Sequence, residues 1–269
     1  MRPRLLLVTD LGYPAAGRVY RDEDIDLAGR LRADFDVALC HPVDAAALMG
    51  GFDLLLVRNT GPVLHYADRY ADFRRQALAA GTRVFTQLSG KADMAGKQYL
   101  LDLTTQGYPV IPTVDRAEDL HLLPDVAEYV VKPKLGADSV GLRFVPRAEL
   151  SDLTGQLVQP RIRFRYEVSF YFVDRDFQYA LHARDPDARW DLTPYEPTGD
   201  DLAFAQRFVD WNDVDHGIQR VDACRTQDGE LLLVELEDLN PFLSLDRVPP
   251  ATRDRFVAAL TASLLRMLA

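Results

Sequence analysis

The chain has 269 residues, 48% of them hydrophobic and 27% charged, which is ordinary for a soluble globular protein. Its net charge of -10 argues against nucleic acid as the main partner, because no broad basic surface is expected. The N-terminal apolar run is too short for a signal peptide, and no run is long enough for a membrane span, so we expect a cytoplasmic protein with no membrane partner.

Residues 1–87 alternate between strand-like and helix-like segments. Short apolar runs, as expected for parallel strands buried on both faces, lie at 4–10, 35–41, 52–59 and 83–87. Helical spacing of apolar residues occurs at 23–33 and at 66–81, where Gly81 ends the helix. This alternation predicts an open α/β sheet. The segment after the first strand lacks the glycine spacing of a dinucleotide fingerprint, so no nicotinamide cofactor is expected.

The pattern changes after residue 88. Helices are predicted before Gly107 and over 200–212 and 249–269. Strands are predicted at 129–134, 140–145 and 156–162, and hairpins over 166–184 and 218–237, the second turning at Asp228-Gly229. This part is therefore expected to be α+β with mostly antiparallel sheets. Cys40 and Cys224 lie in apolar runs and are expected to be reduced structural thiols.

Lys132 stands at the end of one of these strands, next to a segment that contains Gly136, Ser139 and Gly141. An ammonium group beside small residues with accessible backbone amides can hold a polyphosphate. On this segment alone, an ordinary turn is the alternative interpretation.

Carboxylates gather on the last hairpin. Glu235 and Glu237 are two residues apart on an apolar strand, so they point to the same face, and Asp222 lies on the partner strand. Paired carboxylates near a core are costly unless a cation lies between them, and Mg²⁺ prefers such oxygen ligands. The alternative is a solvent-facing strand whose buried face is formed by Val234 and Leu236.

The order and spacing of these segments resemble the ATP-grasp superfamily. The likeness is to the small ligases around D-cycloserine synthetase, the glutamate ligases that modify ribosomal protein, glutathione synthetase and D-alanine–D-alanine ligase, and it covers residues 90–245. It implies an ATP-grasp fold with an N-terminal open α/β domain and two α+β lobes that clasp ATP. The implied domains are residues 1–87, 88–156 and 157–269.

The resemblance also implies residue roles. Asp222, Glu235 and Glu237 match the magnesium ligands, and Arg184 and Arg220 match the arginines near the transferring phosphate and the acyl centre. The nucleotide ligands are matched by the phosphate lysines Lys97 and Lys132, by Gly136, Ser139 and Gly141 in the loop over the phosphates, by Gln159, Pro160, Arg161 and Ile162 in the adenine hinge, and by Glu167 at the ribose or hinge. Gly96 stands where the superfamily commonly has an aspartate before the first lysine.

Three of these positions also have plainer interpretations. Arg184 could pair with a neighbouring aspartate on a surface loop, and Glu167 could face solvent. Arg58 follows an α/β strand at the edge where such sheets place ligand contacts, so it is a candidate for binding a substrate carboxylate. A helix-capping role for its loop is the alternative.

The resemblance implies a ligase that uses ATP and Mg²⁺, or Mn²⁺ in its place. A small-molecule carboxylate would be activated as an acyl phosphate and then coupled to an amine substrate. The alternatives are an ATP-grasp kinase and a nucleotide-binding protein without catalysis. A homodimer is expected only by analogy with similar ligases.

Overall fold

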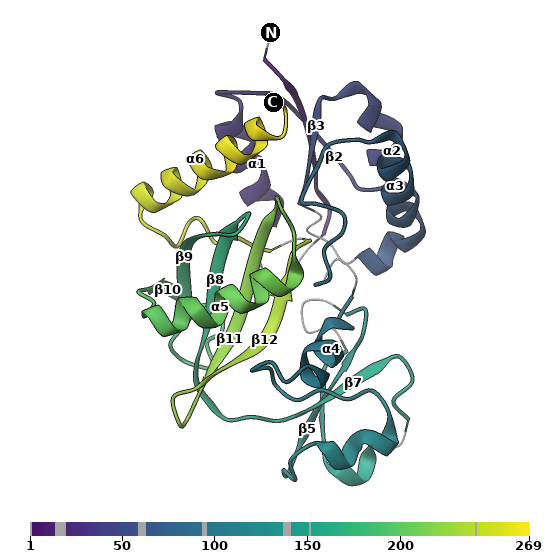
Figure 1. The fold of residues 1–269 in the computed structure, drawn as a ribbon, viewed down its shortest axis with the longest axis vertical. Helices are drawn as coiled ribbons and strands as arrows, with labels where there is room; N and C mark the ends of the chain where they lie inside the picture. The colour runs from purple at the N-terminus through teal and green to yellow at the C-terminus, as the bar shows by residue number, and fades with distance from the viewer. Residues whose placement is uncertain are drawn as a thin grey trace.

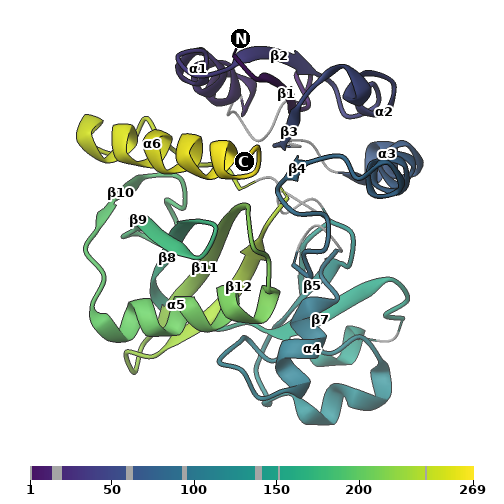
Figure 2. The same cartoon turned by 45° about the horizontal axis from the view of Figure 1, so that its top comes forward.

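The computed structural model describes residues 2–13, 20–58, 63–92, 96–136, 141–150, 152–239 and 241–269. Over these residues the chain forms β-sheets of four, three and five strands. The four-stranded sheet forms a layer at one end of the molecule, and the other two sheets lie beside each other beneath it (Figure 1, Figure 2). None of the helices in the described part of the chain is both long and apolar enough to cross a membrane.

The N-terminal layer is the predicted open α/β sheet, with parallel strands in the order β2-β1-β3-β4. Alternate residues of β1 face opposite cores, so Leu5 and Leu7 pack with α1 while Leu6 and Val8 pack with α3. Its elements are β1 (Arg4–Val8), α1 (Tyr20–Leu31), β2 (Asp36–Cys40), α2 (Ala45–Leu48), η1 (Met49–Gly51), β3 (Leu54–Val57), η2 (Val63–Tyr66), α3 (Ala67–Ala80) and β4 (Val84–Phe85).

The three-stranded sheet is antiparallel, in the order β6-β5-β7. It has a separate small core that includes Tyr129, Val131 and Val158. The predicted domain boundary after residue 156 follows the first residue of β7, although all residues of β7 pair with β5 of the same sheet. The division into domains stays a prediction. The elements of this part are α4 (Tyr99–Thr105), η4 (Ala117–Leu122), β5 (Tyr129–Pro133), β6 (Arg143–Val145), η5 (Arg147–Glu149) and β7 (Gln156–Pro160).

The five-stranded sheet is also antiparallel, in the order β10-β9-β8-β11-β12, and contains both predicted hairpins. The short edge strand β10 was not predicted, because its central Pro194 is tolerated only at an edge and makes the segment look like a connection. The elements are β8 (Phe164–Val173), β9 (Asp176–Ala183), β10 (Leu192–Tyr195), α5 (Gly199–Asn212), β11 (Ile218–Thr226), β12 (Leu231–Glu237) and α6 (Pro250–Arg266).

The two faces of the five-stranded sheet have different neighbours. One face carries Phe170, Val221 and Leu236 and packs against α5 and α4. The opposite face packs against α6 and the N-terminal layer through Tyr171, Tyr179 and their apolar neighbours. The rest of that opposite face carries the polar residues described next, on the side toward the three-stranded sheet.

Candidate active site

Three carboxylates meet on β11 and β12. Asp222 is paired with Glu235, and Glu237 with Arg220, in the antiparallel register of the two strands. One oxygen from each acid lies within 4.8 Å of the others, which makes this the group with metal-binding spacing among the described residues. Leu236, between the two glutamates, is fully buried on the other face, as strand alternation requires. The structure thus brings together the three acids predicted from the sequence.

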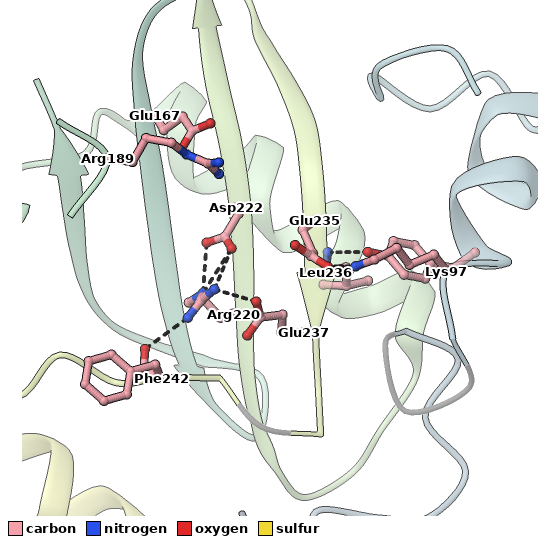
Figure 3. Close-up of polar contacts among 10 residues, drawn as sticks. Lys97, Glu167, Arg189, Arg220, Asp222, Glu235, Leu236, Glu237 and Phe242 are labelled. Carbon is pink, nitrogen blue, oxygen red and sulfur yellow. Dashed lines mark hydrogen bonds and ion pairs between the residues drawn. The ribbon is translucent and has the colours of Figure 1, made fainter. Parts of the chain in front are cut away.

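Arg220 lies among these acids (Figure 3). Its Nε donates to both carboxylate oxygens of Asp222, at 2.9 and 3.1 Å, and its Nη2 donates to Asp222 at 2.8 Å and also to Glu237. Its Nη1 donates to the backbone carbonyl of Phe242 at 3.0 Å. A guanidinium is planar and its N–H groups point in fixed directions. Hydrogen bonds to Asp222, Glu237 and Phe242 together therefore fix both the position and the orientation of the Arg220 side chain.

The two predicted phosphate lysines approach the same place from outside the five-stranded sheet, Lys97 from the turn before α4 and Lys132 from β5. Lys97 forms an ion pair with Glu235 (Figure 3), and its backbone N–H donates to the Lys134 carbonyl at 2.9 Å. Lys132, half-buried on β5, has no ion pair within the described part of the chain. Burial and the neighbouring cations Lys97 and Arg189 lower the pKa of Lys132 to about 7. An ammonium in such surroundings favours an anionic ligand.

Three glycines near the phosphate lysines stand where a larger residue would be strained or crowded. Gly96 has a φ of +83°, and a Cβ there would lie 2.8 Å from a methyl carbon of Leu135. The positive φ, which L side chains rarely adopt, favours glycine before Lys97, whereas the end of the exposed Leu135 side chain could move aside. Gly141 has a φ of +78° and would place a Cβ 2.9 Å from Pro133, and Gly136 also packs on that proline.

Glu167 pairs with Arg189, an arginine that no sequence motif marks as a site residue. Nε of Arg189 donates to Glu167 at 3.1 Å (Figure 3). Burial raises the pKa of Glu167, and the charge of Arg189 acts in the opposite direction. Arg184 is exposed and its Nε donates to His182 at 3.2 Å, so it is neither in this group nor paired with a neighbouring aspartate. No motif distinguishes the two arginines, because both lie in one polar connection between β9 and β10.

The hinge residues lie where β7 leaves the three-stranded sheet. The buried Gln159 side chain donates to Thr113 Oγ1 at 2.8 Å. Arg161 donates its backbone N–H to Glu128 O at 3.0 Å, and its guanidinium pairs with the Glu128 carboxylate and lies 4.5 Å from the centre of the Phe144 ring. Its side chain is therefore directed to the surface of β5 and β6. Pro160 is buried and Ile162 half-buried. The adenine-binding role of the segment stays a prediction.

Arg58 lies apart from this group. Its guanidinium is 1% exposed and forms ion pairs with Glu23 and Asp24 of α1. Two carboxylates therefore already neutralise it, and its contacts do not support the predicted binding of a substrate carboxylate. Ser139 of the predicted phosphate loop lies outside the described residues, and so does Asn240, whose place before Pro241 in the sequence makes it either an additional metal ligand or a cap for the turn.

Comparison with known proteins finds similarity in structure alone. No protein-family model matches the sequence, and no curated protein matches it. A D-cycloserine synthetase is 24% identical with a TM-score of 0.71, and the match covers 97% of this chain and 99% of that one. A D-alanine–D-alanine ligase from Bacillus anthracis, complexed with ATP, is 13% identical with a TM-score of 0.69 and coverage of 98% and 97%. The ATP-grasp ligase PsnB, complexed with a phosphomimetic variant of its minimal precursor, Mg and ADP, is 15% identical with a TM-score of 0.66 and coverage of 98% of each chain.

Proposed function

Because the chain has an ATP-grasp ligase-like fold over nearly its whole length, we propose that it is an ATP- and Mg²⁺-dependent ligase that joins a carboxylate to an amine. The observation that carries the proposal is the meeting of Lys97, just before α4, and Lys132, on β5, with three carboxylates and an arginine from the five-stranded sheet. Opposite charges gathered at the junction of two sheets suit a metal-bound polyphosphate, since such a ligand presents both signs at once.

The donor set fits Mg²⁺. Asp222, Glu235 and Glu237 offer hard oxygen ligands within 4.8 Å of one another, and Mn²⁺ accepts the same donors. In the structure these acids are neutralised by Arg220 and Lys97. When bound, Mg²⁺ would neutralise charge on the phosphates and polarise their oxygens. The acids would then hold the metal, Lys97 would be released from Glu235 to the phosphate oxygens, and Arg220 would stay beside Asp222 and Glu237.

The cations of the site would hold the nucleotide phosphates. Lys132 has no ion pair in the described part of the chain, so phosphate oxygens would supply its counter-charge. Arg189 is close enough to Lys132 to affect its pKa, and we assign to Arg189 the phosphate contact that the resemblance implied for Arg184. The adenine would lie at the hinge formed by residues 159–162.

The reaction would have two steps. An oxygen of the substrate carboxylate attacks the γ-phosphorus of ATP, ADP leaves, and an acyl phosphate forms. The amine nitrogen then attacks the acyl carbon, the amide forms, and phosphate leaves with loss of a proton from nitrogen. Arg220 would stabilise the negative oxygen that develops on the acyl carbon. Cys224, the cysteine on the site's face of the sheet, is fully buried, and burial raises the pKa of its thiol to about 12, so a thioester route is not favoured.

The test is release of ADP from MgATP with panels of carboxylates and amines, each alone and together, and with hydroxylamine to trap an acyl phosphate as a hydroxamate. A ligase releases ADP and yields amide only with both substrates, or hydroxamate with hydroxylamine. A stable phosphate ester without an amine would identify a kinase instead. If nucleotide binds but no ADP is released with any combination of carboxylate and amine, the protein is a nucleotide-binding protein without catalysis.

The proposed phosphate site can be tested by comparing nucleotide binding in two neighbouring lysine variants. Lys132→Ala should abolish tight nucleotide binding in calorimetry while the protein remains folded. Lys134→Ala, two residues away, should retain it, because Lys134 is already paired with Asp115. Equal affinity of the two variants would overturn the proposed phosphate site.

A further inference from the structure

A buried cluster of charges joins α1 to the segment that follows β12. Arg58 donates to Asp24 at 2.9 Å through Nε and to Glu23 at 3.1 Å through Nη2. Asp24 also accepts from the Thr9 hydroxyl. The side chains of all three charged residues are at most 8% exposed. Nothing in the proposed reaction uses this cluster, although burying charges is costly unless each is paired.

Glu23 binds the backbone of residues 241–245. Its carboxylate accepts the N–H of Leu243 at 2.7 Å and the N–H of Leu245 at 3.2 Å. Ser244, between them, has a φ of +52°, which is uncommon for a residue other than glycine. Because Ser244 has a left-handed conformation, the N–H groups of Leu243 and Leu245 both point toward the Glu23 carboxylate, as in the anion-binding backbone segments called nests. A strained residue of this kind persists where its surroundings hold it in place.

The same segment contacts Arg220. The carbonyls of residues 241, 242 and 243 accept hydrogen bonds from Arg58, from Arg220 at 3.0 Å and from the Tyr179 hydroxyl at 2.7 Å, respectively. The segment is therefore fixed on one side by the charge cluster of the N-terminal layer. On the other side it offers the Phe242 carbonyl that receives Nη1 of Arg220 (Figure 3).

We propose that Glu23 and Arg58 are positioning residues, which hold segment 241–245 so that its Phe242 carbonyl fixes the guanidinium of Arg220 between Asp222 and Glu237. The role of Arg220 in the reaction rests on the proposed function, whereas the mechanical link from Glu23 to Arg220 does not. The N-terminal layer then contributes to the chemical step through the backbone of another part of the chain. The effect falls on the orientation of Arg220 and not on the phosphate lysines, which lie on the three-stranded sheet's side.

The test uses Glu23→Gln, which keeps the side chain's size but removes its charge and one of its two accepting oxygens. The Nε–H signal of Arg220, assigned by its loss in Arg220→Lys, is followed by nitrogen-15 NMR. We expect hydrogen exchange of that group to become about tenfold faster or more, because the guanidinium moves more freely once the Phe242 carbonyl that receives its Nη1 is no longer held, and the bonds from Nε to Asp222 then open more often. Asp26→Asn is the control, since Asp26 lies on the same helix but is paired with Arg30 at the surface. An unchanged Arg220 signal in folded Glu23→Gln would overturn the proposal, whether or not the protein proves to be a ligase.

Kinetics give a second readout once substrates are known. Glu23→Gln should lower kcat about tenfold or more and change the KM for ATP by less than about threefold. If Glu23 acts through Arg220, the loss in the double variant with Arg220→Lys is smaller than the product of the single losses. If the loss of kcat in the double variant equals the product of the two single losses, the proposed link from Glu23 to Arg220 is overturned. If Glu23→Gln does not fold, Glu23→Asp keeps the charge beside Arg58 but withdraws the oxygens from the two amides, and the same measurements decide.

Discussion

Nucleotide binding should weaken as the pH rises from 7 to 9, because of Lys132. Without a ligand its pKa is about 7, so about half of the molecules carry the charged form at pH 7 and about one in a hundred at pH 9. Phosphate oxygens favour the ammonium, so binding at high pH requires uptake of a proton. If only the charged form binds, this fall from about one half to about one in a hundred weakens the affinity about fiftyfold. Lys132 retains some contact with solvent, which screens the interaction, so we expect a tenfold to fiftyfold loss.

Titration calorimetry with a non-hydrolysable ATP analogue and Mg²⁺ measures both quantities. Affinity is compared at pH 7, 8 and 9, and proton uptake is obtained from two buffers with different ionisation enthalpies. Nearly one proton should be taken up at pH 8.5. Lys132→Arg is the control, since arginine stays charged and its affinity should vary little over this range. Negligible uptake by the wild-type protein, or the same pH profile in Lys132→Arg, would refute the reasoning.

The same shift affects folding in the absence of nucleotide. The unfolded chain keeps Lys132 protonated up to its ordinary pKa near 10.4, whereas the folded chain releases the proton above about 7. Between these values the unfolded state binds more protons, so the contribution of Lys132 to the free energy of unfolding increases with pH.

Three further predictions concern other sites. Glu235→Gln and Glu237→Gln should each lower ATP-dependent turnover by at least about a hundredfold with the Tm nearly unchanged; turnover within a few-fold of wild type would place the metal site elsewhere. Gly90→Ala should lower the free energy of unfolding by about 1–3 kcal/mol in urea titrations, because its Cβ would lie 2.0 Å from Asp238, whereas Gly50→Ala has open space and should change it little. Arg189→Ala should weaken nucleotide binding more than Arg184→Ala in calorimetry, and the reverse order would restore the assignment made from the sequence.

The elements that were predicted correctly are those with a strong local signal. Buried parallel strands are continuous apolar runs, so β1 and β3 were evident, and the Asp228-Gly229 turn defined the last hairpin. Strand alternation was enough to place Glu235 and Glu237 on one face. The site's acids could therefore be grouped before the structure was known.

Pairings between distant segments were not predictable in this way. The sequence around Arg58 shows a cation after a strand, but its partners Glu23 and Asp24 lie on a helix more than thirty residues earlier. The choice of Arg189 over Arg184 depends on how one connection folds back toward Glu167, and neither apolar spacing nor turn chemistry specifies that path. Polar pairing is set by tertiary packing, which local patterns do not report.

Helix α6 has a consequence for the order in which the protein can fold during synthesis. Its residues Phe256, Leu260 and Leu264 belong to the same core as Leu5 of the first strand. Almost the whole described chain separates the two, so the N-terminal layer cannot complete its core until about residue 264 has been made. The part of this layer's apolar face that α1 does not cover therefore stays exposed while the ribosome continues, and in this interval a chaperone that binds exposed apolar strands would protect the chain from aggregation.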